Sequence, residues 1–152
     1  MRQARAEEAA VLSALAMRSK AHWGYDARFL EACRAQLTLT PAFVEAHPVI
    51  VADNGEGIAG FYTLVRWKAD IELGHFFVDP LAMGRGIGRA LWRDAVDRAA
   101  GLGYSRLLVQ SDPNAESFYL KLGAEPIGDV PSQVLPGRTL PLLVYLLADV
   151  DN

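Results

Sequence analysis

The stretch Phe76-Phe77-Val78-Asp79-Pro80-Leu81-Ala82-Met83-Gly84-Arg85-Gly86-Ile87-Gly88-Arg89-Ala90-Leu91 is the most informative part of this sequence. Its pattern predicts a strand, a glycine-rich turn and a helix. Glycine has no Cβ, so backbone N–H groups in such a turn can approach a ligand closely. The start of the helix adds N–H groups without helical partners and the positive end of the helix dipole. We therefore expect a site for a phosphate or pyrophosphate.

The elements around this stretch follow from hydrophobic periodicity and turn residues. Helices are predicted at about 6–20, 27–36, 41–46, 87–102 and 113–122, and strands at about 1–5, 49–53, 58–68, 71–78, 106–110, 124–130 and 140–148. Asp26 is placed to cap one helix, and Ser111-Asp112-Pro113 supplies a cap and a first-turn proline for another. A helix joins strands 71–78 and 106–110, so these should be parallel. The order predicts an α/β or α+β sheet covered by helices.

Length and composition indicate one domain spanning residues 1–152, without internal repeats or linkers. The net charge is −3 and no basic run occurs, which argues against a nucleic-acid partner. The N-terminus lacks a signal-peptide core, and the longest apolar run, Leu142 to Ala148, is too short to span a bilayer. Cys33 is the only cysteine, which fits a reducing, cytoplasmic setting and a structural thiol. No cluster of metal-ligand residues is evident, so no metal is expected.

The glycine turn does not match two common phosphate loops. The chain has no Gly-Lys pair, which excludes the P-loop motif. The dinucleotide motif Gly-x-Gly-x-x-Gly/Ala fails too, because Arg89 or Leu91 stands at its last position.

A third pattern fits. The turn resembles the acetyl-CoA loop of the GCN5-related N-acetyltransferase (GNAT) family, Gln/Arg-x-x-Gly-x-Gly/Ala, with Met83 as the departure from the pattern. A second segment, Asp112-Pro113-Asn114-Ala115-Glu116-Ser117-Phe118-Tyr119-Leu120-Lys121-Leu122-Gly123-Ala124, is similar to the family signature Asn-x-x-Ala/Ser-x-x-Phe-Tyr-x-x-x-Gly-Phe, with Ala124 in place of the last Phe.

The resemblance implies a mostly antiparallel sheet of about six or seven strands with one parallel, splayed pair and about four helices. It implies acetyl-CoA as the donor, with its pantetheine arm along the strand that precedes the loop. The cofactor-binding residues that it implies are Phe77, Val78, Met83, Gly84, Arg85, Gly86, Ile87, Gly88, Arg89, Asn114, Ser117 and Tyr119.

The resemblance also assigns catalytic roles. Tyr119 matches the family tyrosine that donates a proton to the departing thiolate, and a phenol with a pKa of about 10 is protonated at neutral pH. The base that deprotonates the amine stays open between Glu72, His75 and a water chain. The candidate acceptor residues are His22, Trp23, Tyr25, Trp67 and Arg138.

The sequence thus predicts an N-acetyltransferase that moves an acetyl group from acetyl-CoA to a small-molecule amine by direct transfer in a ternary complex. Two alternatives stay open: an acyl-CoA-binding regulatory module without turnover, and an enzyme acting on a protein or peptide amine. No membrane partner is expected. The acceptor, the acyl length and the oligomeric state, a homodimer included, are not determined by the sequence.

Overall fold

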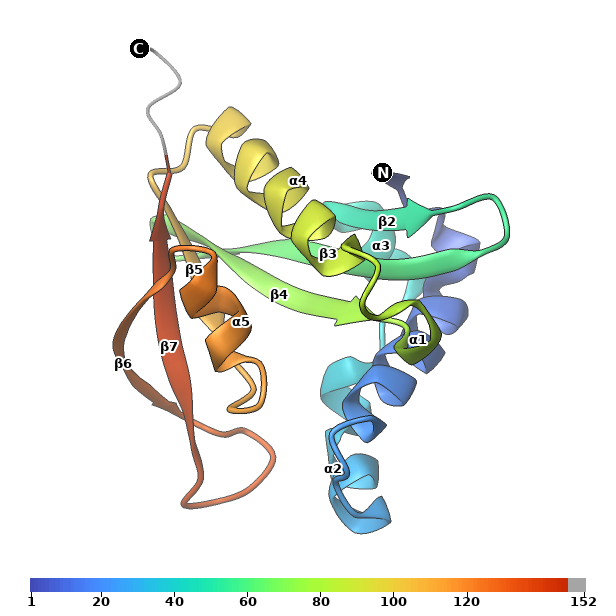
Figure 1. Ribbon diagram of the computed structural model, residues 1–152, viewed down its shortest axis with the longest axis horizontal. Helices are drawn as coiled ribbons and strands as arrows, with labels where there is room; N and C mark the ends of the chain where they lie inside the picture. Colours follow the sequence, from blue (N-terminus) through green and yellow to red (C-terminus); the bar gives the residue numbers. More distant parts are fainter. Residues whose placement is uncertain (148–152) are drawn as a thin grey trace. The chain divides into compact units, whose positions relative to one another are not determined.

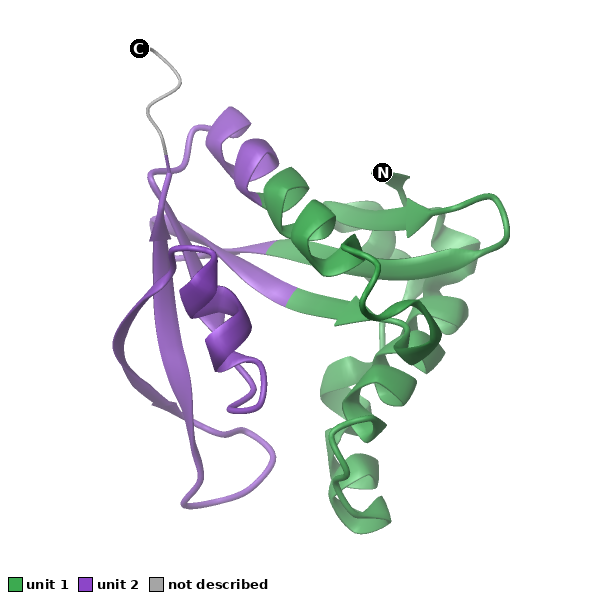
Figure 2. Ribbon diagram, viewed as in Figure 1, with its two compact units in different colours: residues 1–64, 75–95 green, residues 65–74, 96–152 purple. Residues whose placement is uncertain are grey.

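The computed structural model describes residues 1–147 and divides into two compact units. Unit 1 contains residues 1–64 and 75–95, and unit 2 contains residues 65–74 and the chain from 96 onward. Figure 2 colours the two units separately, and Figure 1 labels their helices and strands. The unit boundaries fall inside β3, β4 and α4, so each unit is assembled from two separate segments of the chain.

Seven strands form one sheet with the order β1-β2-β3-β4-β5-β7-β6. The strands are β1 (Arg2–Gln3), β2 (Val49–Asp53), β3 (Ile58–Trp67), β4 (Asp70–Val78), β5 (Arg106–Gln110), β6 (Glu125–Pro131) and β7 (Thr139–Leu146). β4 and β5 pair in parallel, with Ile71 opposite Leu107 and Leu73 opposite Val109. The pairs β1–β2, β2–β3, β5–β7 and β6–β7 are antiparallel. The predicted mixed sheet with one parallel pair is confirmed.

Five α-helices and two 3₁₀ turns complete the described residues. They are η1 (Ala6–Glu8), α1 (Ala9–Ala21), α2 (Ala27–Leu37), α3 (Pro41–Ala46), η2 (Pro80–Ala82), α4 (Ile87–Gly101) and α5 (Glu116–Lys121). Local capping explains where α2 and α3 begin. Asp26 accepts a hydrogen bond from the N–H of Phe29 at 2.8 Å, and Thr40 accepts one from Phe43 at 3.1 Å. Both starts agree with the sequence prediction.

Each unit has its own buried apolar core. In unit 1 the fully buried side chains include Leu12 and Leu15 of α1, Phe61 and Tyr62 of β3, and Leu91 of α4. In unit 2 they include Leu107 and Leu108 of β5 and Leu143 of β7. In Figure 1, α5 runs in roughly the same direction as β7, and the β6–β7 hairpin extends past the end of α5. β6 is the edge strand of the sheet and is exposed along nearly its whole length.

The predicted start of the last helix is wrong. The sequence suggested a cap at Ser111-Asp112 and Pro113 as the first helical residue, but α5 begins at Glu116. The reason is a local turn. Asp112 Oδ1 accepts the backbone N–H of Asn114 at 2.8 Å and its side-chain Nδ2–H at 3.0 Å. This side-chain-to-backbone bond two residues ahead competes with helix formation, so the chain turns through 113–115 before the helix begins.

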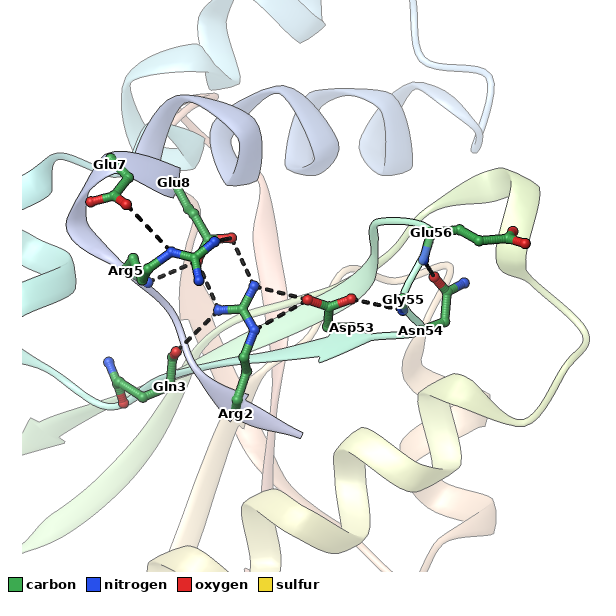
Figure 3. A network of polar contacts seen from close by, with 9 residues as sticks. All are labelled: Arg2, Gln3, Arg5, Glu7, Glu8, Asp53, Asn54, Gly55 and Glu56. Carbon is green, nitrogen blue, oxygen red and sulfur yellow. Dashed lines mark hydrogen bonds and ion pairs between the residues drawn. The ribbon is translucent and has the colours of Figure 1, made fainter.

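Charged residues fix the beginning of the chain in unit 1 (Figure 3). The Arg2 guanidinium donates to both carboxylate oxygens of Glu8 at 2.9 Å and to Asp53 at 3.0 and 3.2 Å. Hydrogen bonds from Arg2 lower the pKa of Glu8 to about 2, with burial acting in the opposite direction and the N–H of Arg5 adding to the decrease. One bidentate arginine therefore ties β1 to η1 and to the end of β2.

Candidate active site

The glycine turn of unit 1 joins β4 to α4 through two left-handed residues. Gly84 and Gly86 have φ values of +81° and +80°. A Cβ built on either glycine would meet no atom within 4 Å, so the backbone conformation, rather than lack of space, requires glycine here. Gly88 lies in the first turn of α4. Gly84, Arg85, Gly86 and Arg89 are exposed, so a ligand can reach this turn.

The helix start supplies hydrogen-bond donors. The N–H of Ala90 bonds to the carbonyl of Gly86 at 3.0 Å and opens the hydrogen-bond ladder of α4. The amides of Ile87, Gly88 and Arg89 precede that bond, and helix geometry gives them no partner within the helix. They stand at the positive end of a 15-residue helix. The turn and the helix start together have the donors and the charge that a phosphate group needs.

Two contacts from β3 seat the beginning of α4, and the sequence analysis missed both. At Gly60 a Cβ would come within 2.8 Å of the Phe77 carbonyl oxygen and 2.9 Å of Leu91 Cδ1. Two residues on, the buried Tyr62 donates its hydroxyl to Asp94 Oδ2 at 2.5 Å. A glycine inside a strand is the signal that could have identified the first contact, because it marks a close approach of other atoms.

Asp79 holds the entry to the glycine turn. Its Oδ1 accepts the N–H of Leu81 at 3.1 Å and caps η2. Its Oδ2 accepts from Arg18 Nη2 at 2.9 Å, and its own N–H donates to the Ala59 carbonyl at 2.8 Å. The first residue after β4 is therefore fixed to β3 and α1 within unit 1.

His75, a candidate base on β4, lies among aromatic rings in unit 1. Its Nδ1 is 2.8 Å from Thr63 Oγ1, and the rings of Phe43, Phe61 and Phe77 surround it at centroid distances of 5.7 to 6.4 Å. Its buried Nε2 has no hydrogen-bond partner of good geometry among the described residues. Burial lowers the pKa of His75 to about 4, although the backbone of Gln36 acts in the opposite direction. His75 is therefore neutral at pH 7.

Unit 2 carries the other two candidate catalytic residues. Glu72 on β4 is half-buried, and this loss of water raises the pKa of its carboxyl group. Tyr119 on α5 is 5% exposed, and its ring packs edge-on against Phe118. Burial raises the pKa of the Tyr119 phenol, and the negative charge of Asp112 adds to the increase. Both side chains therefore favour their protonated forms more than exposed residues would.

The remaining cofactor candidates of unit 2 lie at the start of α5. Asn114 is in the turn held by Asp112, and Ser117 is in the first turn of the helix. Both are exposed. The structure therefore gives Asn114 a turn-forming contact and leaves its role toward a ligand as a prediction.

The acceptor candidates fall into two groups. In unit 1, the His22 and Trp23 rings meet edge to face at 5.9 Å after α1, and Trp23 is 44% exposed. Tyr25 lies close to Phe29, with Lys20 Nζ 5.1 Å from its ring centre. In unit 2, Trp67 ends β3 with Lys68 Nζ 5.0 Å from its ring, and Arg138 lies in the β6–β7 connection, where its carbonyl accepts from the Ser132 N–H. His22, Trp23 and Tyr25 thus come from one short segment of the chain, whereas Trp67 and Arg138 come from two separate segments.

Two negative findings apply to residues 1–147. No helix in that range has the length and apolar character needed to cross a membrane. No group of three or more His, Cys, Asp or Glu side chains in the same range is arranged to hold a metal ion.

Comparison with known proteins agrees with this geometry. A search of curated protein sequences finds no match. Among solved structures, the chain is similar to a GCN5-related N-acetyltransferase from Rhodopseudomonas palustris, with a TM-score of 0.80, 22% identity and coverage of 96% of this chain and 94% of the other. It is also similar to the PaiA N-acetyltransferase from Thermoplasma acidophilum in complex with coenzyme A, with a TM-score of 0.76, 17% identity and coverage of 95% and 96%. A phosphinothricin acetyltransferase from Sinorhizobium meliloti in complex with acetyl-CoA has a TM-score of 0.69, 19% identity and coverage of 97% and 88%.

The sequence also matches a protein family. The family model described as "Acetyltransferase (GNAT) domain" matches residues 8–133, which include the glycine turn, β4, β5 and α5. This match confirms the resemblance drawn from the two sequence motifs and the expectation of an acetyltransferase. The chain belongs to the GNAT family of acetyltransferases.

Proposed function

We propose that this protein is an N-acetyltransferase that transfers an acetyl group from acetyl-CoA to the amine of a small molecule, directly and in a ternary complex. The observation that carries the proposal is the exposed glycine turn, in which two residues with positive φ lead into the start of α4. The structures of PaiA with coenzyme A and of the phosphinothricin acetyltransferase with acetyl-CoA, which share the fold, support the choice of donor.

The glycine turn is suited to hold the donor's pyrophosphate. We assign the amides of Arg85, Gly86, Ile87, Gly88 and Arg89 to this group, with Met83 and Gly84 shaping the turn. The exposed Arg85 and Arg89 add positive charge. The family resemblance assigns the backbone of Phe77 and Val78, together with Asn114 and Ser117, to the pantetheine arm.

Tyr119 is assigned as the general acid. Acetyl-CoA supplies the acetyl group and a thiolate leaving group. The phenol is protonated at neutral pH, and burial raises its pKa further, so Tyr119 holds the proton until negative charge develops on the sulfur and can then donate it. No covalent acetyl-enzyme is proposed, since the buried Cys33 is the only cysteine and lies in the helix α2.

Glu72 is the better of the two candidate bases. Its carboxyl pKa is raised by burial, which makes it a stronger proton acceptor than an exposed glutamate. The pKa of His75 is lowered to about 4 by burial among aromatic rings, which makes it a weak base at neutral pH. A water chain to Glu72 would serve the same purpose. His22, Trp23 and Tyr25, together with Trp67 and Arg138, are proposed to contact the acceptor.

The assignment of the loop can be tested by calorimetric titration with coenzyme A. The variant Gly86→Ala should weaken binding about tenfold, because L-alanine at this φ costs about 1–2 kcal/mol. Gly55→Ala is the matched control: Gly55 has a φ of +85° and open space around it but lies in the β2–β3 turn. Equal affinities of the two variants would contradict the assignment.

The chemistry can be tested by thiol release with a panel of small amines and of peptides. Tyr119→Phe should lower kcat by about 100-fold with little change in KM for acetyl-CoA. Tyr104→Phe removes a hydroxyl elsewhere in unit 2 and should leave kcat unchanged. Turnover of peptides alone would favour a protein acceptor, and tight coenzyme A binding without turnover of any amine would favour a regulatory module.

We also propose that residues 1–152 act as one domain in the cytoplasm. The unit boundaries cut through β3, β4 and α4 rather than through linkers, and the single cysteine fits a reducing compartment.

A further inference from the structure

One ion pair in unit 1 links the end of α1 to the entry of the glycine turn. Arg18 Nη2 lies 2.9 Å from Asp79 Oδ2, while Asp79 Oδ1 caps the 3₁₀ turn that leads into Met83 and Gly84. One carboxylate thus holds the first turn of the loop with one oxygen and α1 with the other. The proposed catalytic and acceptor residues do not take part in this contact.

The position of Asp79 creates an electrostatic problem for an anion-binding loop. Its side chain is 16% exposed, so water screens its charge only partly, whereas Arg18 is 53% exposed. Burial acts to raise the pKa of Asp79, but hydrogen bonds from Arg18 and from the N–H of Leu81 outweigh it and lower the pKa, so the group is ionised at pH 7. A carboxylate at the entry of a loop for pyrophosphate is repulsive unless a cation neutralises it.

We propose that Arg18 is a positioning residue for donor binding: it neutralises Asp79 and fastens the entry of the glycine turn to α1. This inference rests on the proposed function, namely that the turn holds the pyrophosphate of acetyl-CoA. It assigns Arg18 no contact with the donor. Its effect on the reaction is carried through Asp79 and the turn that Asp79 caps.

The first test is the affinity for coenzyme A measured by calorimetric titration. Arg18→Gln should weaken binding about three- to fivefold, the range of an exposed ion pair. Arg34→Gln is the matched control, since Arg34 is 57% exposed, pairs with Glu31 within α2 and gives the same change in net charge. Equal affinities of the Arg18 and Arg34 variants would overturn the proposal.

A second variant separates charge neutralisation from general damage. Asp79→Asn keeps an Oδ1 acceptor for Leu81 but removes the negative charge. The double variant Arg18→Gln/Asp79→Asn should therefore bind coenzyme A nearly as tightly as the wild type. A double variant as weak as Arg18→Gln alone would show that neutralisation of Asp79 is not what Arg18 provides.

A shortened donor gives a readout that a merely structural role would not give. S-acetylpantetheine lacks the pyrophosphate, so Arg18→Gln should leave its kcat/KM unchanged while raising KM for acetyl-CoA. Equal losses with both donors would overturn the proposal. If the wild type itself does not bind coenzyme A, the proposed function fails and this inference with it; if the wild type binds and Arg18→Gln binds equally well, only the role of Arg18 fails.

Discussion

Lys68 stands out at the scale of single residues because of its backbone. Among residues 1–147 it is the only residue other than glycine with a positive φ, +57°. It lies in the tight turn that connects β3 to β4. Left-handed backbone costs an L-residue with a Cβ about 1–2 kcal/mol. The contact of Lys68 Nζ with the Trp67 ring is exposed to water and offsets only part of this cost.

Replacing Lys68 should therefore stabilise the protein. We expect Lys68→Gly to raise the free energy of unfolding by about 0.5–1 kcal/mol, because glycine adopts this φ without strain. Urea unfolding measures the change as a shift of the midpoint at constant slope. Ala69→Gly is the control and should lower stability. A lower free energy of unfolding for Lys68→Gly would show that the contacts of the lysine side chain stabilise the protein by more than the left-handed backbone costs.

His75 predicts how stability depends on pH. Its pKa is about 4 in the folded protein and 6.5 when exposed, so the unfolded chain binds the extra proton between these values. The contribution of His75 to stability is complete above pH 6.5 and is lost as the pH falls toward 4. Between pH 7 and pH 5 this loss amounts to about 2 kcal/mol.

Unfolding of His75→Gln at several pH values checks this prediction. The variant cannot take up the proton, so its free energy of unfolding should decline less steeply between pH 7 and pH 5 than that of the wild type. Parallel pH profiles for the wild type and His75→Gln would contradict the prediction.

At the scale of elements, β3 determines how α4 is seated in unit 1. Gly60 admits the Phe77 backbone and Leu91, and Tyr62 bonds to Asp94 one turn further along α4. The glycine turn lies directly before this helix, so its amides are directed by the same two contacts. The geometry of the proposed donor site therefore depends on β3, although the part of β3 in unit 1 contains none of the residues assigned to the site.

Gly60→Ala tests this dependence. The added Cβ would lie 2.8 Å from a backbone oxygen, which cannot move without shifting β4, so we expect a loss of about 1–3 kcal/mol in unfolding free energy. Affinity for coenzyme A should fall as well. Gly101→Ala, at the last residue of α4 and with open space around it, should change neither quantity appreciably. Unaltered stability of Gly60→Ala would mean that β3 and α4 separate easily.

Local signals explain which elements could be predicted from the sequence. The caps at Asp26 and Thr40 act within three residues, and the prediction placed α2 and α3 within one residue of their observed ends. The start of α5 was missed because Asp112 has two local options, a helix cap or a turn, and the residues alone do not decide between them.

Contacts between distant residues explain what could not be predicted. Arg2 and Asp53 are 51 positions apart, and no local pattern links them. The insertion of β7 between β5 and β6 is likewise set by pairing across the sheet. Within the candidate site, the glycine motif indicated the turn, but the contact of Arg18 with Asp79 and the aromatic surroundings of His75 emerged only from packing.

At the scale of the whole molecule, the course of the chain through the two units matters. The chain leaves unit 1 within β3, returns within β4 and leaves again within α4, as the colour changes in Figure 2 show. Each unit holds one part of β3, β4 and α4. If one unit unfolded alone, all three elements would be cut short in the unit that stays folded. We therefore expect one cooperative calorimetric transition, with equal van't Hoff and calorimetric enthalpies. Two separable transitions would show that the units are independent domains.

Donor binding should be visible in the same experiment. Coenzyme A at about 100 times its Kd should add about 2.7 kcal/mol to the stability of the folded state and raise Tm by about 5–10 °C. Gly86→Ala should show a smaller increase than Gly55→Ala at the same concentration. An unchanged Tm for the wild type at saturating coenzyme A would count against donor binding.

The backbone of Gly84 and Gly86 has a stereochemical consequence. Their φ values near +80° are those that a mirror-image amino acid prefers. L-alanine and D-alanine have the same size and hydrophobicity, yet at these positions they should act in opposite ways, the first straining the turn and the second fitting its backbone. A semisynthetic protein with D-alanine at residue 84 should therefore keep the turn that L-alanine distorts, and handedness alone would distinguish the two proteins.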